Sequence, residues 1–149
     1  MTDISQLIAP DAVLAGLKAM SKEQCLDLLA RHAAAATGVA SDVIATALKR
    51  REALGSTGIG NGIAMPHAPI DGLIAPFGLL ACLAKPLPFD AVDGEPVDIL
   101  CLILTPEAGQ GQHLNALACV ARRLQRPEIR EAIRRARHPQ DVHAALCES

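Results

Sequence analysis

A chain of 149 residues, half of them hydrophobic, is long enough for one domain with a single sizeable core. Its net charge of −2 argues against a general affinity for polyanions, and no apolar run reaches the roughly 18 residues that a membrane span needs. The N-terminus has neither a basic segment nor an apolar signal core, so we expect one cytoplasmic domain over residues 1–149, without membrane insertion.

The first elements in chain order are two helices. Ser21 and Gln24 form a capping-box pattern that predicts a helix start, and Gly38 supplies its end. Ser41 can begin a second helix, which carries Arg51 in its last turn. The side chains expected to face the core recur at helical spacing: Cys25, Leu28, Leu29, Ala33, Val43, Ile44, Ala47 and Leu48.

Two apolar runs further along, residues 77–84 and 97–104, predict buried strands, because each is short and is followed by a proline-containing pair, Lys85-Pro86 or Thr105-Pro106. Asp93-Gly94 between them marks a tight turn, and residues 89–92 fit a short edge strand leading into it.

Three helices are expected in the C-terminal part. A long amphipathic helix is indicated by apolar residues at helical spacing, namely Leu114, Leu117, Ala118, Ala121 and Leu124. Pro127 and Pro139 each suit the first turn of a shorter helix, since that position has no backbone hydrogen bond to lose. Strands followed by helices in this way predict an α/β fold.

The cysteines do not suggest a cross-linked protein. Their number is odd, and none forms a Cys-x-x-Cys pair with another. Most lie in apolar stretches, where a free thiol behaves as a small hydrophobic side chain. We therefore predict five reduced structural thiols: Cys25, Cys82, Cys101, Cys119 and Cys147.

The most unusual local feature is a glycine-rich stretch, residues 55–62, that runs through a short apolar strand to Pro66 and His67. Such a backbone can take positive φ and present N–H groups to an anion. The stretch has neither the Gly-Lys-Ser/Thr of a P-loop nor a Gly-x-Gly-x-x-Gly that opens a helix. What remains is His67 in a loop after the strand, as a functional or a purely structural histidine.

Residues 51–67 resemble the active-site signature of the fructose/mannitol-type IIA domains of the bacterial phosphotransferase system, most closely the nitrogen-regulatory branch. The likeness continues in residues 89–98, 104–106 and 112–114, and so covers nearly the whole chain. It implies a three-layer α/β sandwich, a small mixed sheet of about four or five strands with helices on both faces.

The resemblance also implies a chemistry. His67 would accept a phosphoryl group from a phosphohistidine on an HPr-like carrier protein, because neutral imidazole is a competent nucleophile near neutral pH. His113 and Arg51 match the family's second histidine and active-site arginine. Each has a structural alternative: His113 could cap the next helix, and Arg51 could complement a helix C-terminus. No cofactor or metal is expected.

The sequence departs from the family pattern in two places, of which the loop bears on partner choice. Ala68 stands where glycine is common, and the loop at residues 107–112 is richer in glycine than usual. The protein would act as a regulator that binds target proteins according to its phosphorylation, or alternatively as a sugar-uptake component that passes the phosphoryl group to a IIB domain. No transporter or IIB-like cysteine domain is fused to these residues, which favours the regulator.

Two other classes of function are disfavoured. Seven of the fourteen basic residues lie between Arg122 and Arg137, but acidic residues sit among them and no aromatic residues interleave, so nucleic-acid binding is not expected. The five histidines show no metal-ligand spacing.

Overall fold

The computed structural model describes residues 4–108 and 114–147. The strands are β1 (Val13–Leu17), β2 (Gly58–Gly60), β3 (Ile63–Ala64), β4 (His67–Ile70), β5 (Phe77–Leu87) and β6 (Val97–Pro106). The helices are α1 (Ile4–Leu7), α2 (Lys22–Thr37), α3 (Ser41–Ala53), α4 (Leu114–Leu124), α5 (Pro127–Arg135) and α6 (Pro139–Cys147).

All six strands belong to one mixed sheet, ordered β1-β5-β6-β3-β2, with β4 also paired to β6. Strand β6 is central: β5 runs antiparallel along one side, and β3 and then β4 run parallel along the other. The expected mixed sheet is confirmed, but it has more strands than predicted because β1, β2 and β4 were not anticipated.

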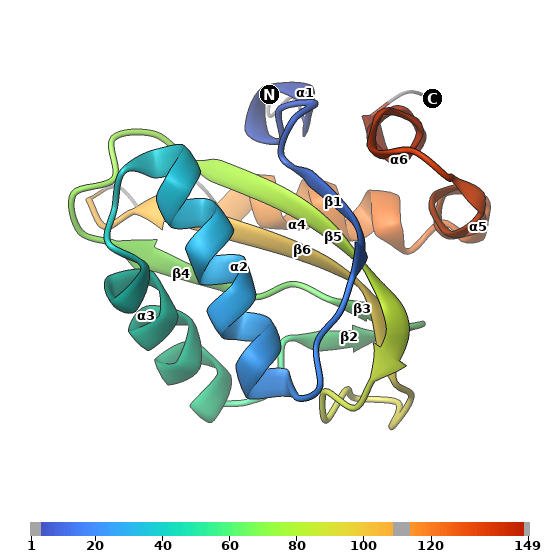
Figure 1. The fold of residues 1–149 in the computed structure, drawn as a ribbon, viewed down its shortest axis with the longest axis horizontal. Coiled ribbons are helices and arrows are strands. Elements are labelled where there is room, and N and C mark those ends of the chain that lie inside the picture. The colour runs from blue at the N-terminus through green and yellow to red at the C-terminus, as the bar shows by residue number, and fades with distance from the viewer. Residues whose placement is uncertain (1–3, 109–113, 148–149) are drawn as a thin grey trace.

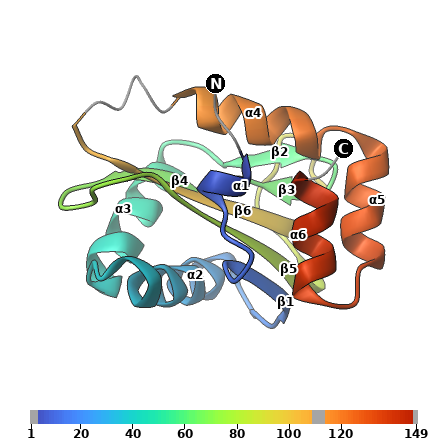
Figure 2. The same cartoon turned by 90° about the horizontal axis from the view of Figure 1, so that it is seen from above.

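Helices cover both faces of the sheet, which confirms the three-layer sandwich (Figures 1 and 2). Helices α2 and α3 pack on one face, whereas α1, α4, α5 and α6 pack on the other. Alternate residues of β6 serve the two cores: Leu100 and Leu102 face α2 and α3, while Ile99 and Cys101 face the opposite layer. This explains why the β6 sequence reads as a continuous apolar run.

The predicted start and end of α2 are confirmed. Ser21 Oγ accepts a hydrogen bond from Gln24 N at 3.1 Å, and Gly38 ends the helix with a φ of 80°. The Gln24 side chain returns to the backbone N–H of Met20 rather than to that of Ser21. Helix α3 contains Ser41 as its first residue, not as a cap, and the preceding Ala40 provides no side-chain cap.

Residues 89–92 do not form the predicted edge strand. The backbone oxygen of Phe89 accepts hydrogen bonds from the side chains of Lys22 and Ser56, so it is unavailable to a strand ladder. The two expected buried strands are present and run longer than predicted, to Leu87 and Pro106.

The α4 helix exists as predicted, but its buried face is shifted. Ala116, Val120 and Leu124 are buried at a spacing of four residues, whereas Leu117 is half-buried and Ala118 is exposed. Helices α5 and α6 begin at the predicted prolines.

None of the five cysteines takes part in a disulfide, as predicted. Several arginines of α4 and α5 are engaged within the protein: Arg123 donates to the Leu146 carbonyl, Arg130 to the Leu124 carbonyl, and Arg134 to Asp98.

Within residues 4–108 and 114–147, no helix combines the length and apolar character required to cross a membrane.

Candidate functional site

The glycine-rich stretch folds as a tight hairpin rather than an anion cradle. Strands β2 and β3 are joined by Asn61 and Gly62, whose φ angles of 59° and 80° are those of a turn that favours Asn-Gly. The amides of Thr57, Gly58 and Asn61 already donate to side chains, so they are not presented to an anion. These three amides therefore do not form the anion-facing backbone that a glycine-rich stretch can provide.

His67 is the first residue of β4 instead of lying in a loop. It pairs with Ile103 of β6, and the preceding Pro66 carbonyl accepts from Ile103 N at 2.9 Å. The following Ala68 and Ile70 are buried against α2 and α3, whereas His67 is only half-buried. The sheet therefore fixes the backbone of His67 while its ring stays accessible.

Two contacts hold the His67 ring. Nδ1 lies 2.8 Å from the Met65 carbonyl oxygen, and Arg51 Nε lies 3.3 Å from Nε2. A carbonyl oxygen can only accept, so Nδ1 carries the ring proton and Nε2 keeps its lone pair. The Arg51 N–H group is a suitable donor to that lone pair. The contacts thus select the tautomer whose free nucleophilic atom is Nε2.

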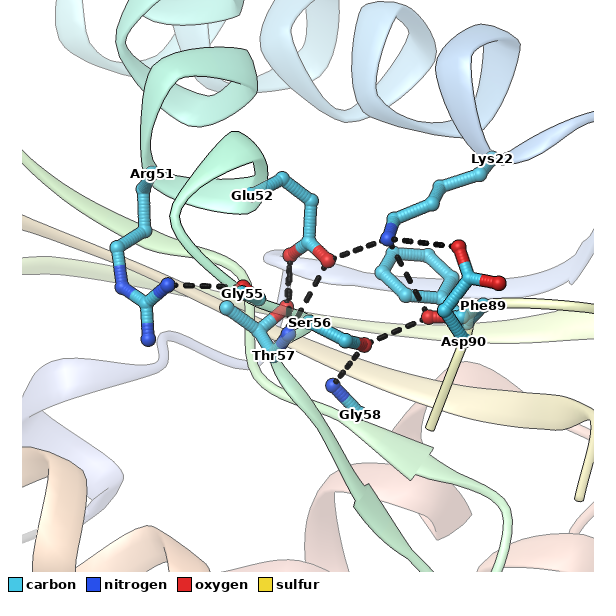
Figure 3. A network of polar contacts seen from close by, with 9 residues as sticks. All are labelled: Lys22, Arg51, Glu52, Gly55, Ser56, Thr57, Gly58, Phe89 and Asp90. Atoms are coloured by element: carbon cyan, nitrogen blue, oxygen red, sulfur yellow. Dashed lines mark hydrogen bonds and ion pairs between the residues drawn. The ribbon is translucent and has the colours of Figure 1, made fainter. Parts of the chain in front are cut away.

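Arg51 reaches the ring from the last turn of α3. Its Nη1 also donates to the Gly55 carbonyl at 2.9 Å, which ties the guanidinium to the loop between α3 and β2 (Figure 3). A planar guanidinium holds two such partners in a fixed geometry. The cation is therefore positioned beside the nucleophilic ring atom.

A second group of polar contacts begins at the next residue, Glu52. Its carboxylate accepts from both the amide and the hydroxyl of Thr57 and pairs with Lys22 Nζ at 2.6 Å (Figure 3). Ser56 Oγ accepts from Gly58 N and donates to the Phe89 carbonyl. The loop that leads to the hairpin is thus held to α2, α3 and the segment at residue 89.

Of the three site residues predicted from sequence, His67 and Arg51 are brought together, and His113 lies outside the described residues. Sequence reasoning missed Glu52, Lys22 and the Met65 carbonyl. Glu52 could have been found, because it directly follows Arg51 in the signature, but Lys22 and a main-chain oxygen give no such signal. Within the described parts of the chain, no group of three or more His, Cys, Asp or Glu residues could hold a metal.

Comparisons with known proteins place this site in a family context. Residues 6–149 match the family described as phosphoenolpyruvate-dependent sugar phosphotransferase system, EIIA 2. A nitrogen regulatory protein of Bradyrhizobium diazoefficiens is 41% identical over 96% of this chain and 94% of its own length. A fructose-specific EIIA component of Haloferax volcanii is 34% identical over 99% of this chain and 97% of its own length.

The fold agrees with these sequence matches. The crystal structure of the nitrogen regulatory protein IIA-Ntr from Neisseria meningitidis superposes with a TM-score of 0.91 at 28% identity, covering 96% of this chain and 98% of that one. The chain therefore belongs to the EIIA type 2 family of the phosphoenolpyruvate-dependent sugar phosphotransferase system.

Proposed function

We propose that this protein is a regulatory IIA protein that accepts a phosphoryl group on Nε2 of His67. The observation that carries the proposal is the pair of ring contacts, Nδ1 to the Met65 carbonyl and Nε2 to Arg51. The first contact keeps the proton on Nδ1, and the second places a cation where negative charge will arrive. An accessible imidazole lone pair beside a fixed guanidinium suits phosphoryl transfer, which depends chiefly on placement and charge compensation.

The donor would be a phosphohistidine on an HPr-like carrier. The phosphorus–nitrogen bond on the carrier breaks, its electron pair returns to the carrier's imidazole, and the Nε2 lone pair of His67 forms the new bond. Because one phosphoramidate replaces another, the step is readily reversible. Five cysteines without a disulfide suit a reducing compartment, which supports a cytoplasmic setting for the exchange.

Arg51 has to change partners during this step. Its Nε–H faces the Nε2 lone pair before transfer, so it must turn toward the phosphoryl oxygens as the new bond forms. The guanidinium has five N–H groups, and its contacts with the described residues use two of them. Retaining the Gly55 contact would keep the cation nearby while the remaining N–H groups bind phosphoryl oxygens. His113, directly before α4, is proposed as a further donor to the phosphoryl group.

The test is incubation with phosphoenolpyruvate and the purified carrier enzymes, followed by intact-protein mass measurement. Wild type should gain one phosphoryl group, in a linkage that is labile in acid and stable in alkali, and His67→Ala should gain none. His32→Ala is a matched control, because His32 is an exposed histidine on α2, and it should be phosphorylated normally. An unchanged gain in His67→Ala would refute the assignment.

The regulatory role is supported by the nitrogen regulatory relatives at up to 41% identity, against 34% for the fructose-specific relative. A regulator must bind a target differently in its two phosphorylation states. Pull-downs with phosphorylated wild type and with His67→Ala should therefore retain different proteins. If neither form retains a target, while phosphorylated protein passes its phosphoryl group quantitatively to a IIB component, the sugar-uptake role is correct instead.

A further inference from the structure

The Glu52 carboxylate is connected to the His67 ring by a continuous series of hydrogen bonds. Glu52 accepts from Thr57 N at 3.1 Å through Oε2 and at 3.2 Å through Oε1, and it also accepts from the Thr57 hydroxyl. The side chain is only 6% exposed, so little water competes for these contacts. The backbone of Thr57 is therefore fixed by a side chain on the last turn of α3.

Thr57 in turn fixes the residue that orients the ring. Its carbonyl oxygen accepts from Met65 N at 3.0 Å, and the Met65 carbonyl accepts from His67 Nδ1 at 2.8 Å. Hydrogen bonds weaken steeply when their angle or distance departs from the preferred range. A displacement of Thr57 would thus be transmitted through Met65, from its N–H group to its carbonyl group, and so to the oxygen that selects the His67 tautomer.

Lys22 keeps the Glu52 carboxylate in place. Its ammonium lies 2.6 Å from Glu52 Oε2, 3.3 Å from the Phe89 carbonyl oxygen and 4.7 Å from the centre of the Phe89 ring (Figure 3). A largely buried carboxylate without such a partner is strongly disfavoured. The pair therefore joins the first turn of α2 to the last turn of α3 at the entrance to the glycine-rich loop.

We propose that Glu52, held by Lys22, is a positioning residue for phosphoryl transfer: through Thr57 and Met65 it keeps His67 in the tautomer with a free Nε2. The inference rests on the proposed role of His67 as phosphoryl acceptor. Arg51 and Glu52 divide the task, because the first acts on the ring directly and the second acts through the backbone. Arg51 and Glu52, which are adjacent in the last turn of α3, thus fix the two ring nitrogens of His67.

The charge on Glu52 is central to this role. A carboxylate offers two acceptor oxygens to three donors, namely the Thr57 amide, the Thr57 hydroxyl and the Lys22 ammonium. In Glu52→Gln one oxygen becomes an NH₂ group, which must face a donor. The substitution preserves volume but removes acceptor capacity, so Thr57 should lose its fixed position while the helix stays intact.

The test measures the His67 tautomer directly, by nitrogen NMR of unphosphorylated protein labelled at histidine, together with the rate of phosphoryl uptake. Wild type should show a protonated Nδ1 and an unprotonated Nε2. Glu52→Gln should show a mixture of tautomers and take up phosphoryl groups roughly tenfold to a hundredfold more slowly, as expected for a misplaced reacting group. Asp27→Asn is the matched control, since Asp27 pairs with Lys49 at 2.8 Å and also joins α2 to α3.

A single wild-type tautomer in Glu52→Gln, or the same mixture in Asp27→Asn, would overturn the proposal. If Glu52→Gln does not fold, Lys22→Met takes its place, because it removes the cation but retains an apolar side chain over the Phe89 ring. A wild-type tautomer there would be equally decisive. The tautomer needs no phosphorylation, so a wild type that accepts no phosphoryl group would refute the proposed function separately.

Discussion

Two fully buried cysteines should make the protein sensitive to alkali. Cys25 lies in the core beneath α2 and α3, and Cys101 lies in the core on the opposite face of the sheet. Burial raises the pKa of the Cys25 thiol from 9.0 to about 11 and that of Cys101 from 9.0 to about 12. Both thiols therefore stay protonated in the folded protein at a pH where the same thiols ionise in the unfolded chain.

The sign of the effect follows from proton binding. Above the unfolded pKa the folded state holds more protons than the unfolded state, so the free energy of unfolding falls as pH rises. Each thiol contributes about 1.4 kcal/mol per pH unit between its unfolded and folded pKa values. From about pH 8 to about pH 10, Cys25 and Cys101 together should lower the free energy of unfolding by about 3 kcal/mol.

The assay is urea unfolding followed by far-ultraviolet circular dichroism at both pH values, for wild type and for Cys25→Ala/Cys101→Ala. The variant should be less stable at the lower pH, because two side chains in packed cores are truncated. Its further loss on going to the higher pH should be about 3 kcal/mol smaller than that of wild type. Lysines titrate in both proteins alike, and the sequence contains no tyrosine, so the difference between the two losses is due to the two thiols. Equal losses of unfolding free energy in wild type and in the variant would refute the reasoning.

Three further substitutions test the site and its surroundings. Arg51→Lys cannot bridge His67 and the Gly55 carbonyl, so phosphoryl uptake should slow roughly a hundredfold in a single-turnover assay; an unchanged rate would contradict the assigned role. His113→Ala should slow uptake by a similar factor with a stability change of only about 1 kcal/mol, whereas a lower melting temperature with an unaltered rate would identify a helix cap. Gly58→Ala places a Cβ 2.9 Å from the Ala91 Cα, so denaturation should show about 1–3 kcal/mol of destabilisation, and an unchanged midpoint would contradict this contact.

Local signals in the sequence predicted most of the helices. The Ser21 cap, the Gly38 stop and the two prolines that open α5 and α6 act within a few residues, so their effect is readable without the fold. Strand β1 was missed because its residues do not alternate between buried and exposed, and because it contains Gly16 at a φ of 72°. Only its parallel pairing with β5 makes it a strand.

The site was predictable where it follows one continuous stretch of chain. His67 and Arg51 belong to a single signature, and the hairpin between them brings their side chains together. The partners that orient them were not predictable. Met65 contributes a carbonyl oxygen, which every residue has, and Lys22 belongs to another helix that only the tertiary structure brings to Glu52.

The position of His67 at the start of a strand bears on how a phosphorylation signal can be transmitted. Its backbone is paired to the central strand of the sheet, and its neighbours Ala68 and Ile70 are buried, so a phosphoryl group at Nε2 has little freedom to move the surrounding chain. The group adds a charge of about −1.5 to −2 at one fixed, accessible point. We expect target proteins to distinguish the two states by that charge and by the reoriented Arg51, not by a rearranged fold. Phosphorylation should then leave the circular dichroism spectrum unchanged and alter hydrogen exchange only near Arg51 and His67. Changes in hydrogen exchange that spread over α5 and α6 would contradict this expectation.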